Sequence, residues 1–297
     1  MTAAEKVTVE AADGRRLEAL SAGPRDGLAL VLHNGTPSGL IVLPSIARAA
    51  AGRGLRLVQY ARPGYEGSTP CPGRRVADAA GDVAAVLDAL GAAEFVTAGW
   101  SGGGPHALAC AAGLPGRCLA AASMAGVAPY RADGLDWLAG MGAENVAEFA
   151  AAAAGAGPLT AYLEPAAAEL RGLTGAQVAA GLGSLASPAD KAAVTGEFAD
   201  YLAASFRAAV SAGMAGWRDD DLAFTADWGF TVAEAGRGAP VAVWQGDQDL
   251  MVPWAHGQWL AAHIPGARAH LLPGEGHLTL VNAFGAILLD LLGLAGR

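Results

Sequence analysis

The sequence predicts an α/β fold, in which a mostly parallel sheet is covered by helices on both faces. Two observations carry this prediction. Apolar runs of strand length alternate with amphipathic stretches of helix length up to residue 129 and again from residue 238. Several of the short runs are apolar throughout, as in strands that are buried on both faces of a parallel sheet. We therefore expect one core that is built from residues 1–129 and 238–297.

The segment between these two parts, residues 130–237, has a different pattern. It is rich in alanine, its apolar residues recur at helical spacing, and it holds no convincing strand. Because the alternation of strands and helices resumes after it, this segment is predicted to be a helical block inserted into the core rather than a separate C-terminal domain.

The first elements are predicted to form a hairpin. Residues 7–11 and 16–19 are short alternating runs, and the Asp-Gly pair between them tolerates the positive φ that a tight turn requires. Residues 28–32 are a continuous apolar run, which predicts a strand buried on both faces. Residues 37–51 follow as a helix candidate that stops before a glycine.

The remaining elements are predicted by the same two patterns. Runs that are mostly apolar predict the other strands, at residues 55–60, 95–98, 119–124, 241–245 and 267–272. Apolar residues at intervals of three and four predict the other helices, at residues 76–90, 105–112, 254–262 and 278–294. The order of these elements, strand then helix then strand, is typical of a parallel sheet with helices on both faces.

Composition and charge exclude several classes of protein. The chain has 297 residues with 19 basic and 28 acidic side chains, so its formal net charge is −9. The basic residues form no run, which argues against nucleic-acid binding. No uncharged apolar stretch reaches the roughly 20 residues of a membrane helix, and the first residues lack a basic stretch followed by an apolar run. We expect no membrane contact and no secretory signal.

The cysteines favour a reducing compartment. There are three of them, Cys71, Cys110 and Cys118, and an odd, sparse set does not suit a disulfide scaffold. Together with the missing secretory signal, this predicts a cytoplasmic protein. The expected partner is a small-molecule substrate, and the sequence carries no signal of an oligomeric state.

The clearest chemical motif is the sequence Gly-Trp-Ser-Gly-Gly at residues 99–103. It stands between the predicted strand 95–98 and the predicted helix 105–112. A nucleophilic serine uses such a tight strand-to-helix turn, which lifts its hydroxyl above the edge of the sheet, and glycines two residues before and after it relieve crowding. Here the serine is Ser101, and the backbone N–H of Gly102 can stabilise an oxyanion in the same space. The alternative is a glycine-rich turn that holds a serine without a chemical role.

A serine nucleophile also needs a base and an acid that orients the base. The motif at residues 99–103, in this context, resembles the nucleophile turn of the α/β-hydrolase superfamily, and the resemblance extends over nearly the whole chain. It implies an α/β-hydrolase fold with a mostly parallel eight-stranded sheet, and it identifies the inserted block, residues 130–237, as a helical cap. It also implies the chain order nucleophile, acid, histidine.

The C-terminal part supplies residues that match this acid and this histidine. The sequence VAVWQGDQDLMVP at residues 241–253 is similar to the family's strand followed by G-x-x-D-x-x-V-P, which makes Asp249 the matching acid and leaves Asp247 as the alternative. The sequence LPGEGHL at residues 272–278 is similar to the family's histidine loop, with His277 as the base. The resemblance therefore implies a Ser-Asp-His triad.

The second oxyanion donor is expected in the loop after the third strand. This loop reads HNGTPSG at residues 33–39, whereas the common family form is H-G-x-P, in which the N–H of x is the donor. The present chain carries Asn34 between the histidine and the glycine. Alignment on the glycine and the proline makes Thr36 the donor, which we favour, and alignment on the histidine makes it Gly35.

Substrate contacts are expected from side chains beside the serine and from the cap. Trp100 precedes the serine, and His33 ends the third strand next to the oxyanion loop. Trp137, Trp217 and Trp228 in the cap are candidates for an apolar pocket that would suit an acyl or aryl group. Aromatic residues at helical spacing are more often part of a core, which is the competing interpretation of these three.

Two charged segments have a structural and a functional interpretation. Residues 219–221 are three consecutive aspartates, which we expect to form a solvated face or a helix start. Their alternative role is an anchor for a substrate amine, as in the caps of proline-iminopeptidase-like relatives. Residues 62–68, with the sequence Arg-Pro-Gly-Tyr-Glu-Gly-Ser, are similar to a family segment whose usual role is a structural turn under the active site.

These observations lead to an expected function. The resemblance implies a serine hydrolase that cleaves a small or medium carboxylic ester through an acyl-enzyme and needs no cofactor and no metal. The alternatives are an aminopeptidase of the proline-iminopeptidase type, and a thioesterase, a perhydrolase related to cofactor-free haloperoxidases, or a non-hydrolytic tailoring enzyme or ligand-binding member of the fold.

Overall fold

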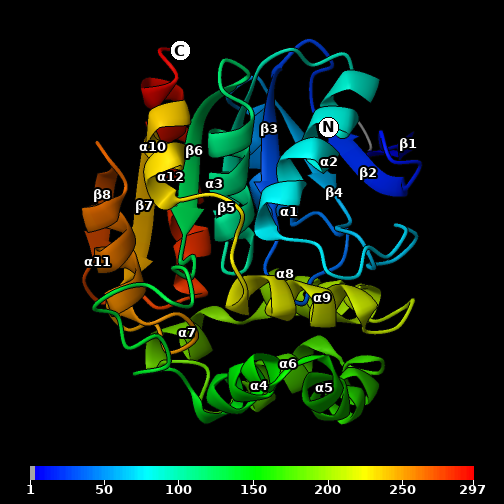
Figure 1. The fold of residues 1–297 in the computed structure, drawn as a ribbon, viewed down its shortest axis with the longest axis vertical. Helices are drawn as coiled ribbons and strands as arrows, with labels where there is room; N and C mark the ends of the chain where they lie inside the picture. The colour runs from blue at the N-terminus through cyan, green and yellow to red at the C-terminus, as the bar shows by residue number, and fades with distance from the viewer. Residues whose placement is uncertain (1–3) are drawn as a thin grey trace.

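The fold is built on one eight-stranded sheet (Figure 1). The computed structural model describes residues 4–297. Across the sheet, the strands follow the order β1-β2-β4-β3-β5-β6-β7-β8, in which β1 and β2 pair antiparallel and all pairs from β4 to β8 are parallel. The strands are β1 (Glu5–Glu10), β2 (Arg16–Ala22), β3 (Leu28–His33), β4 (Leu55–Tyr60), β5 (Phe95–Trp100), β6 (Cys118–Met124), β7 (Val241–Gly246) and β8 (Arg268–Leu272). This confirms the predicted α/β fold.

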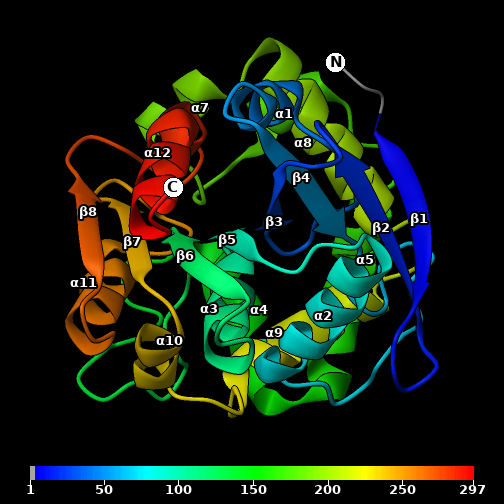
Figure 2. The same cartoon turned by 90° about the horizontal axis from the view of Figure 1, so that it is seen from above.

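Helices cover both faces of this sheet, as Figure 2 shows. On one face lie α1 (Pro44–Ala51) and α12 (Phe284–Leu294). On the other face lie the remaining core helices: α2 (Ala79–Ala89), α3 (Gly103–Gly113), α10 (Val232–Gly238) and α11 (Trp254–His263). Two of the core helices are preceded by a 3-10 turn. These turns are η1 (Val76–Asp78) before α2 and η2 (Thr279–Ala283) before α12.

A hydrophobic core fills the space on each side of the sheet. Along β3, Leu30 and Leu32 belong to the core under α1 and α12, whereas Ala29 and Val31 belong to the core on the opposite face. Side chains of a strand alternate between its two faces, so a strand buried on both must be apolar at successive positions. This is why the central strands are recognisable in the sequence as continuous apolar runs.

Six further helices lie at one end of the sheet. They are α4 (Ala143–Ala154), α5 (Ala156–Leu170), α6 (Gly175–Gly181), α7 (Pro188–Ala193), α8 (Gly196–Ala209) and α9 (Ala215–Thr225). In Figure 1 they lie below the ends toward which the parallel strands point, with α8 and α9 next to the sheet. We call these six the cap helices. They lie within the segment for which an inserted helical block is predicted.

Three predicted helices differ from the observed ones at their starts. The helix predicted at residues 37–51 begins only at Pro44, because the residues before it form a loop that is held against α8. The helices predicted at residues 76–90 and 278–294 each begin with a 3-10 turn, η1 and η2. The periodicity identifies the buried face of each helix, but contacts with other segments set where the helix begins.

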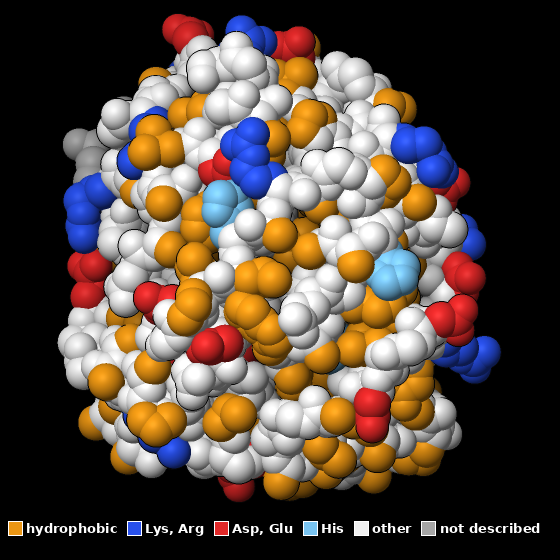
Figure 3. All heavy atoms as spheres, turned by 90° about the vertical axis from the view of Figure 1, so that its left-hand side faces the viewer, with side chains coloured by type: hydrophobic (Ala, Val, Ile, Leu, Met, Phe, Trp, Pro, Cys, Tyr) orange, Lys and Arg blue, Asp and Glu red, His pale blue; other side chains and the backbone are white. Residues whose placement is uncertain are grey.

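Within residues 4–297, no helix combines the length and apolar character that crossing a bilayer requires. Figure 3 shows one face, on which basic and acidic side chains stand singly or in small groups among apolar and neutral ones. The exposed large apolar side chains are Val146, Leu250 and Leu289, which come from separate parts of the chain.

Candidate active site

Ser101 occupies a strained turn between β5 and α3. Its φ is 57°, in the left-handed region that non-glycine residues rarely adopt, while its N–H donates to the carbonyl of Met124 at 2.8 Å. The chain around it is tightly packed: a Cβ on Gly99 would lie 2.0 Å from the carbonyl oxygen of Gly103, and one on Gly103 would lie 2.1 Å from that of His33. The glycines of the motif are therefore required by space, as the sequence pattern predicts.

His277 and Asp249 form a buried pair at the ends of neighbouring strands. His277 follows β8, Asp249 follows β7, and His277 Nδ1 lies 2.8 Å from Asp249 Oδ2. Asp249 Oδ1 accepts the backbone N–H groups of Met251 at 2.9 Å and Val252 at 2.8 Å, so the carboxylate is fixed from both sides. The alternative acid, Asp247, is exposed and instead accepts the N–H of residue 274.

The electrostatics of this pair favour a charged histidine. Burial by itself lowers the pKa of His277, but the negative charge of Asp249 and the hydrogen bond to it outweigh burial, so that the pKa lies above its ordinary value. A base with a raised pKa accepts a proton more readily.

Ser101 and His277 line the same cavity. Its volume is about 110 Å³, and most of its wall is apolar. The lining residues are Asn34, Gly35, Thr36, Pro37, Ser38, Trp100, Ser101, Leu182, Tyr201, Leu202, Ser205, Phe206, Met251, His277 and Leu278. This lining contains no Asp, Glu, Lys or Arg. The cavity therefore holds a serine hydroxyl and an imidazole within an uncharged, apolar surrounding.

The loop after β3 borders this cavity next to the serine. A Cβ on Gly35 would lie 3.2 Å from Ser101 Cβ, and a Cβ on Gly102 would lie 2.6 Å from Thr36 Oγ1. Both candidate oxyanion residues of this loop thus approach the nucleophile turn closely. A side chain at position 35 would displace Ser101, and one at position 102 would displace Thr36.

A buried ionic network around Asp220, which sequence reasoning missed, binds the loop after β3. Asp220 on α9 is fully buried, and its carboxylate accepts the Thr36 hydroxyl at 2.8 Å, the Arg62 guanidinium at 2.6 Å, Arg74 at 2.6 Å and the Tyr65 hydroxyl at 2.9 Å. Burial alone would raise the pKa of Asp220, but the charges of the two arginines hold it well below its usual range. Asp220 is therefore ionised.

Arg62 connects this network to the backbone of the loop. Its guanidinium donates to the carbonyl of Asn34 at 2.7 Å and to that of Gly35 at 2.9 Å. Arg62 itself is buried and does not line the cavity. The segment 62–68 thus has a structural role, and this role extends to the position of the oxyanion loop.

The expectation of a solvated face at residues 219–221 is wrong. All three aspartates are buried: Asp220 bonds to Arg62 and Arg74, Asp219 pairs with Arg218 at 2.8 Å, and Asp221 lies beside Glu148, where burial raises its pKa well above the ordinary value. None of the three lines the cavity. Arginines at positions 62 and 74, in an otherwise weakly charged chain, were the only sequence signal of such a network.

The five candidate substrate contacts divide into two groups. Trp100 lines the cavity, and its Nε1 donates to the carbonyl of His277 at 3.2 Å. The Trp100 and His277 rings are stacked, with their centroids 6.3 Å apart. His33 is buried and does not line the cavity, and burial lowers its pKa well below the ordinary value. Trp137, Trp217 and Trp228 are buried and bond from Nε1 to Ala128, Glu148 and Phe224, so the structure does not bring them to the cavity.

The cap reaches the cavity through other residues, which sequence reasoning did not select. Tyr201, Leu202, Ser205 and Phe206 all lie on α8 at helical spacing, so that one face of this helix covers the cavity. Leu182, which follows α6, completes this side. The signal in the sequence was the amphipathic pattern of α8, but the pattern does not say which surface its apolar face covers.

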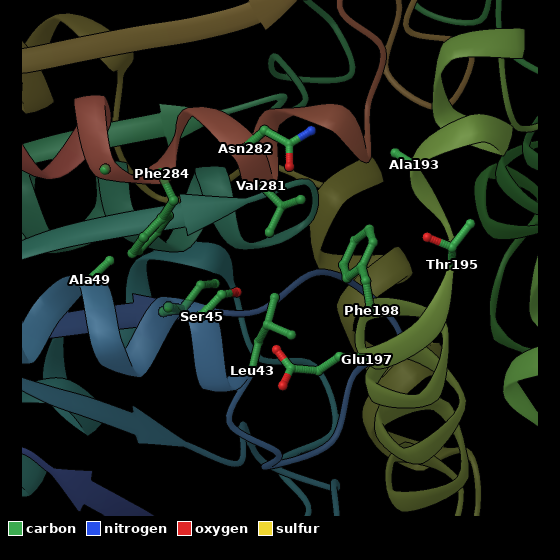
Figure 4. Close-up of a pocket in the computed structure, with 12 residues that line it drawn as sticks. Leu43, Ser45, Ala49, Ala193, Thr195, Glu197, Phe198, Val281, Asn282 and Phe284 are labelled. Atoms are coloured by element: carbon green, nitrogen blue, oxygen red, sulfur yellow. The ribbon is translucent and has the colours of Figure 1, made fainter. Parts of the chain in front are cut away.

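A second hollow lies nearby, between α1, α8 and α12 (Figure 4). Its volume is about 470 Å³, and Leu43, Phe198, Val281 and Phe284 are among the side chains that line it. Phe198 belongs to its wall, and the Phe198 ring also stacks on Trp100 with centroids 6.2 Å apart. Trp100 in turn lines the cavity that contains the serine, so the stacked pair has one ring in the lining of each space.

No candidate metal centre is found in the described part of the chain. Among residues 4–297, no group of three or more His, Cys, Asp or Glu side chains is arranged to hold a metal ion. Cys71, Cys110 and Cys118 are free thiols.

Comparisons with known proteins agree with the fold. A family model described as alpha/beta hydrolase fold matches residues 29–284, which is most of the chain. An alpha/beta hydrolase fold protein from Nakamurella multipartita is 28% identical with a TM-score of 0.67, over 99% of this chain and 100% of that one. No curated protein sequence matches this chain significantly.

Two further solved structures show the same fold at lower identity. An enol-lactonase from Burkholderia xenovorans is 22% identical with a TM-score of 0.65, over 97% of this chain and 100% of that one. An esterase from a Rhodococcus species is 20% identical with a TM-score of 0.64, over 97% of this chain and 99% of that one.

Proposed function

Because the chain belongs to the alpha/beta hydrolase fold family and is a hydrolytic enzyme, we propose that it is a serine hydrolase acting on a small or medium carboxylic ester through an acyl-enzyme. One observation carries this proposal: Ser101 and His277 line one apolar cavity, and His277 is paired at 2.8 Å with the buried Asp249. Nothing in a purely ligand-binding role requires this combination of side chains.

The acylation step follows from this geometry. Ser101 Oγ attacks the ester carbonyl carbon while His277 Nε2 takes the hydroxyl proton, since Nδ1 is engaged by Asp249. Asp249 holds the tautomer that leaves Nε2 free, and its charge stabilises the imidazolium. The tetrahedral intermediate then collapses: the bond from carbon to the alcohol oxygen breaks, and the imidazolium gives its proton to that oxygen. The products are a free alcohol and the Ser101 acyl ester.

The oxyanion and the second half of the reaction need no further group. The backbone N–H groups of Gly102 and Thr36 are proposed to bind the oxyanion, with Gly35 as the alternative to Thr36. Water then attacks the acyl carbon as His277 takes a proton from it, and the acid is released when the proton returns to Ser101 Oγ. The route uses no redox step and requires neither cofactor nor metal.

The cavity supports an ester in preference to an aminoacyl substrate. An aminopeptidase needs a carboxylate that binds the substrate amine, and the cavity lining contains no acidic side chain. Asp219 and Asp220 are bonded to arginines instead, Asp221 lies beside Glu148, and none of the three lines the cavity. With a volume of about 110 Å³ the cavity holds a short acyl group, so small acyl chains are the proposed substrates.

The experiment that tests the proposal compares wild-type protein with Ser101→Ala on a substrate panel. The panel holds p-nitrophenyl esters from acetate to octanoate, a γ-lactone, an acyl thioester and an aminoacyl p-nitroanilide. We expect short esters to be cleaved and Ser101→Ala to reduce kcat/KM by about 10⁴-fold or more, because it removes the nucleophile. Circular dichroism checks that the variant is folded.

Ser211→Ala is the matched control, since Ser211 is exposed on the cap and does not line the cavity. It should leave turnover unchanged. Ester cleavage that persists in Ser101→Ala at more than a few per cent of the wild-type rate would contradict the assignment. Cleavage of the anilide rather than the esters would favour the aminopeptidase.

A further inference from the structure

A buried carboxylate of the cap binds the backbone next to the candidate histidine. Asp190 lies on α7 and has no measurable exposure. Its Oδ2 accepts the N–H of His277 at 3.1 Å, and its Oδ1 accepts those of Leu278 at 2.6 Å and Thr279 at 3.1 Å. Three successive amides of the histidine loop therefore converge on one side chain that is distant in sequence, at the start of η2.

The surroundings of Asp190 are built for this contact. The Ser187 hydroxyl donates to Asp190 Oδ2 at 3.0 Å and accepts the Asp190 N–H at 3.2 Å, which fixes the side chain on its own helix. On the other side, a Cβ on Gly276 would lie 2.3–2.5 Å from the carboxylate atoms, so only glycine at 276 permits this approach. The partners of Asp190 are thus amides and a hydroxyl, and hydrogen bonds from N–H groups to an ionised carboxylate are among the stronger ones.

We propose that Asp190 is a positioning residue: its carboxylate fixes the backbone of residues 277–279 and thereby holds the His277 imidazole between Asp249 and Ser101. The inference rests on the proposed function, since it assigns a role relative to the catalytic base. The imidazole has one fixed bond, to Asp249, and can still swing about it if its backbone moves. Displacement of reacting groups by about 1 Å can cost about a hundredfold in rate.

The charge of Asp190 supports the same role. The charged groups that face the imidazole are Asp249, from the segment after β7, and Asp190, from α7. Against burial, which lowers the pKa of His277, both negative charges raise it. Activity requires a neutral base, so kcat/KM falls as the pH drops through this pKa. Loss of the charge at 190 lowers the pKa, and the acid limb of the profile must then move to lower pH.

The test compares Asp190→Asn with wild-type protein in two measurements. The first is the pH profile of kcat and kcat/KM on the preferred ester. The second is an NMR titration of the His277 imidazole, assigned with His277→Ala, which needs no substrate. We expect kcat to fall about tenfold to a hundredfold with KM changed less than about threefold, and both the acid limb and the NMR midpoint to move to lower pH.

A milder variant and a control accompany this comparison. Ser187→Ala keeps the carboxylate but removes the hydroxyl that fixes it, so a smaller loss of kcat in the same direction is expected. Glu275→Gln is the control and removes a negative charge two residues from His277. The Glu275 carboxylate accepts none of the N–H groups of residues 277–279, so this variant should keep the kcat of wild-type protein.

Unchanged kcat and an unmoved NMR midpoint in folded Asp190→Asn would overturn the inference, as would a loss confined to thermal stability. This failure is distinct from that of the proposed function, which would appear as wild-type turnover that does not depend on Ser101. The NMR titration reports on the environment of His277 without substrate, so it tests the inference whether or not the proposed function holds.

Discussion

At the residue scale, two acidic side chains only two positions apart have different surroundings. Asp249 is buried, receives two backbone N–H groups on one oxygen, and contacts His277 with the other. Asp247 is exposed and accepts the N–H of Gly274, which belongs to the loop before the histidine. Only the first can orient an imidazole and stabilise its charged form.

This difference predicts a ranking of two matched substitutions. Asp249→Asn should reduce kcat/KM by about 10³–10⁴-fold, because an amide at this place favours the wrong tautomer of His277. Asp247→Asn should change it less than about threefold, since its bond to Gly274 lies outside the cavity. Steady-state kinetics on one ester measure both. The opposite ranking would show that the orienting acid has been assigned to the wrong residue.

At the scale of elements, α8 determines the size of the cavity. One of its faces covers the serine with Tyr201, Leu202 and Phe206, and the same helix carries Phe198, whose ring stacks on Trp100. On the far side of Phe198 lies the hollow of about 470 Å³ in Figure 4. One ring of this stacked pair thus lines the small cavity, and the other lines the larger hollow.

Phe198→Ala tests whether the stacked rings of Phe198 and Trp100 limit the length of the acyl chain that the cavity accepts. With the ring removed, the catalytic cavity gains space toward the hollow, and we expect kcat/KM for octanoate relative to acetate esters to rise about tenfold. Phe230→Ala, an aromatic truncation elsewhere in the cap segment and outside both cavities, is the control. An unchanged chain-length profile in Phe198→Ala would mean that Trp100 alone closes this side.

At the scale of the whole molecule, two aspartates of the cap hold two parts of the site. Asp190 on α7 binds the histidine loop, and Asp220 on α9 binds the loop of the proposed oxyanion donor through Thr36 and Arg62. The cap therefore contributes more than a cover to the cavity. Its two buried carboxylates bind segments of the core that carry His277 and the loop of the proposed oxyanion donor.

The Asp220 network predicts a large effect on stability. Asp220→Asn leaves the buried charges of Arg62 and Arg74 without their counterion, and removal of one partner of a buried ion pair costs about 3–5 kcal/mol. Urea denaturation should show this decrease in the free energy of unfolding, while Glu169→Gln, on the exposed side of α5, should change it by less than about 0.5 kcal/mol. A loss below about 1 kcal/mol would show that water compensates the arginines.

The sequence by itself determined the fold class and the candidate residues for the proposed chemistry. Strands buried on both faces are mostly apolar, and a serine at a positive φ between a strand and a helix needs glycines around it, so both features are local and readable. The match of residues 241–253 and 272–278 to known spacings then selected Asp249 and His277. These choices depend on short segments, whose physics is contained in the neighbouring residues.

Only the tertiary structure decided what surrounds these residues. The burial of Asp220, its bonds to Arg62, and the contact of Asp190 with residues 277–279 join segments about 90 to 160 positions apart, and no local pattern specifies such pairs. For the same reason, we predicted cap tryptophans as the lining of the pocket, whereas the structure shows that residues of α8 line it. An amphipathic pattern states that a helix buries one face, whereas chain packing decides what that face meets.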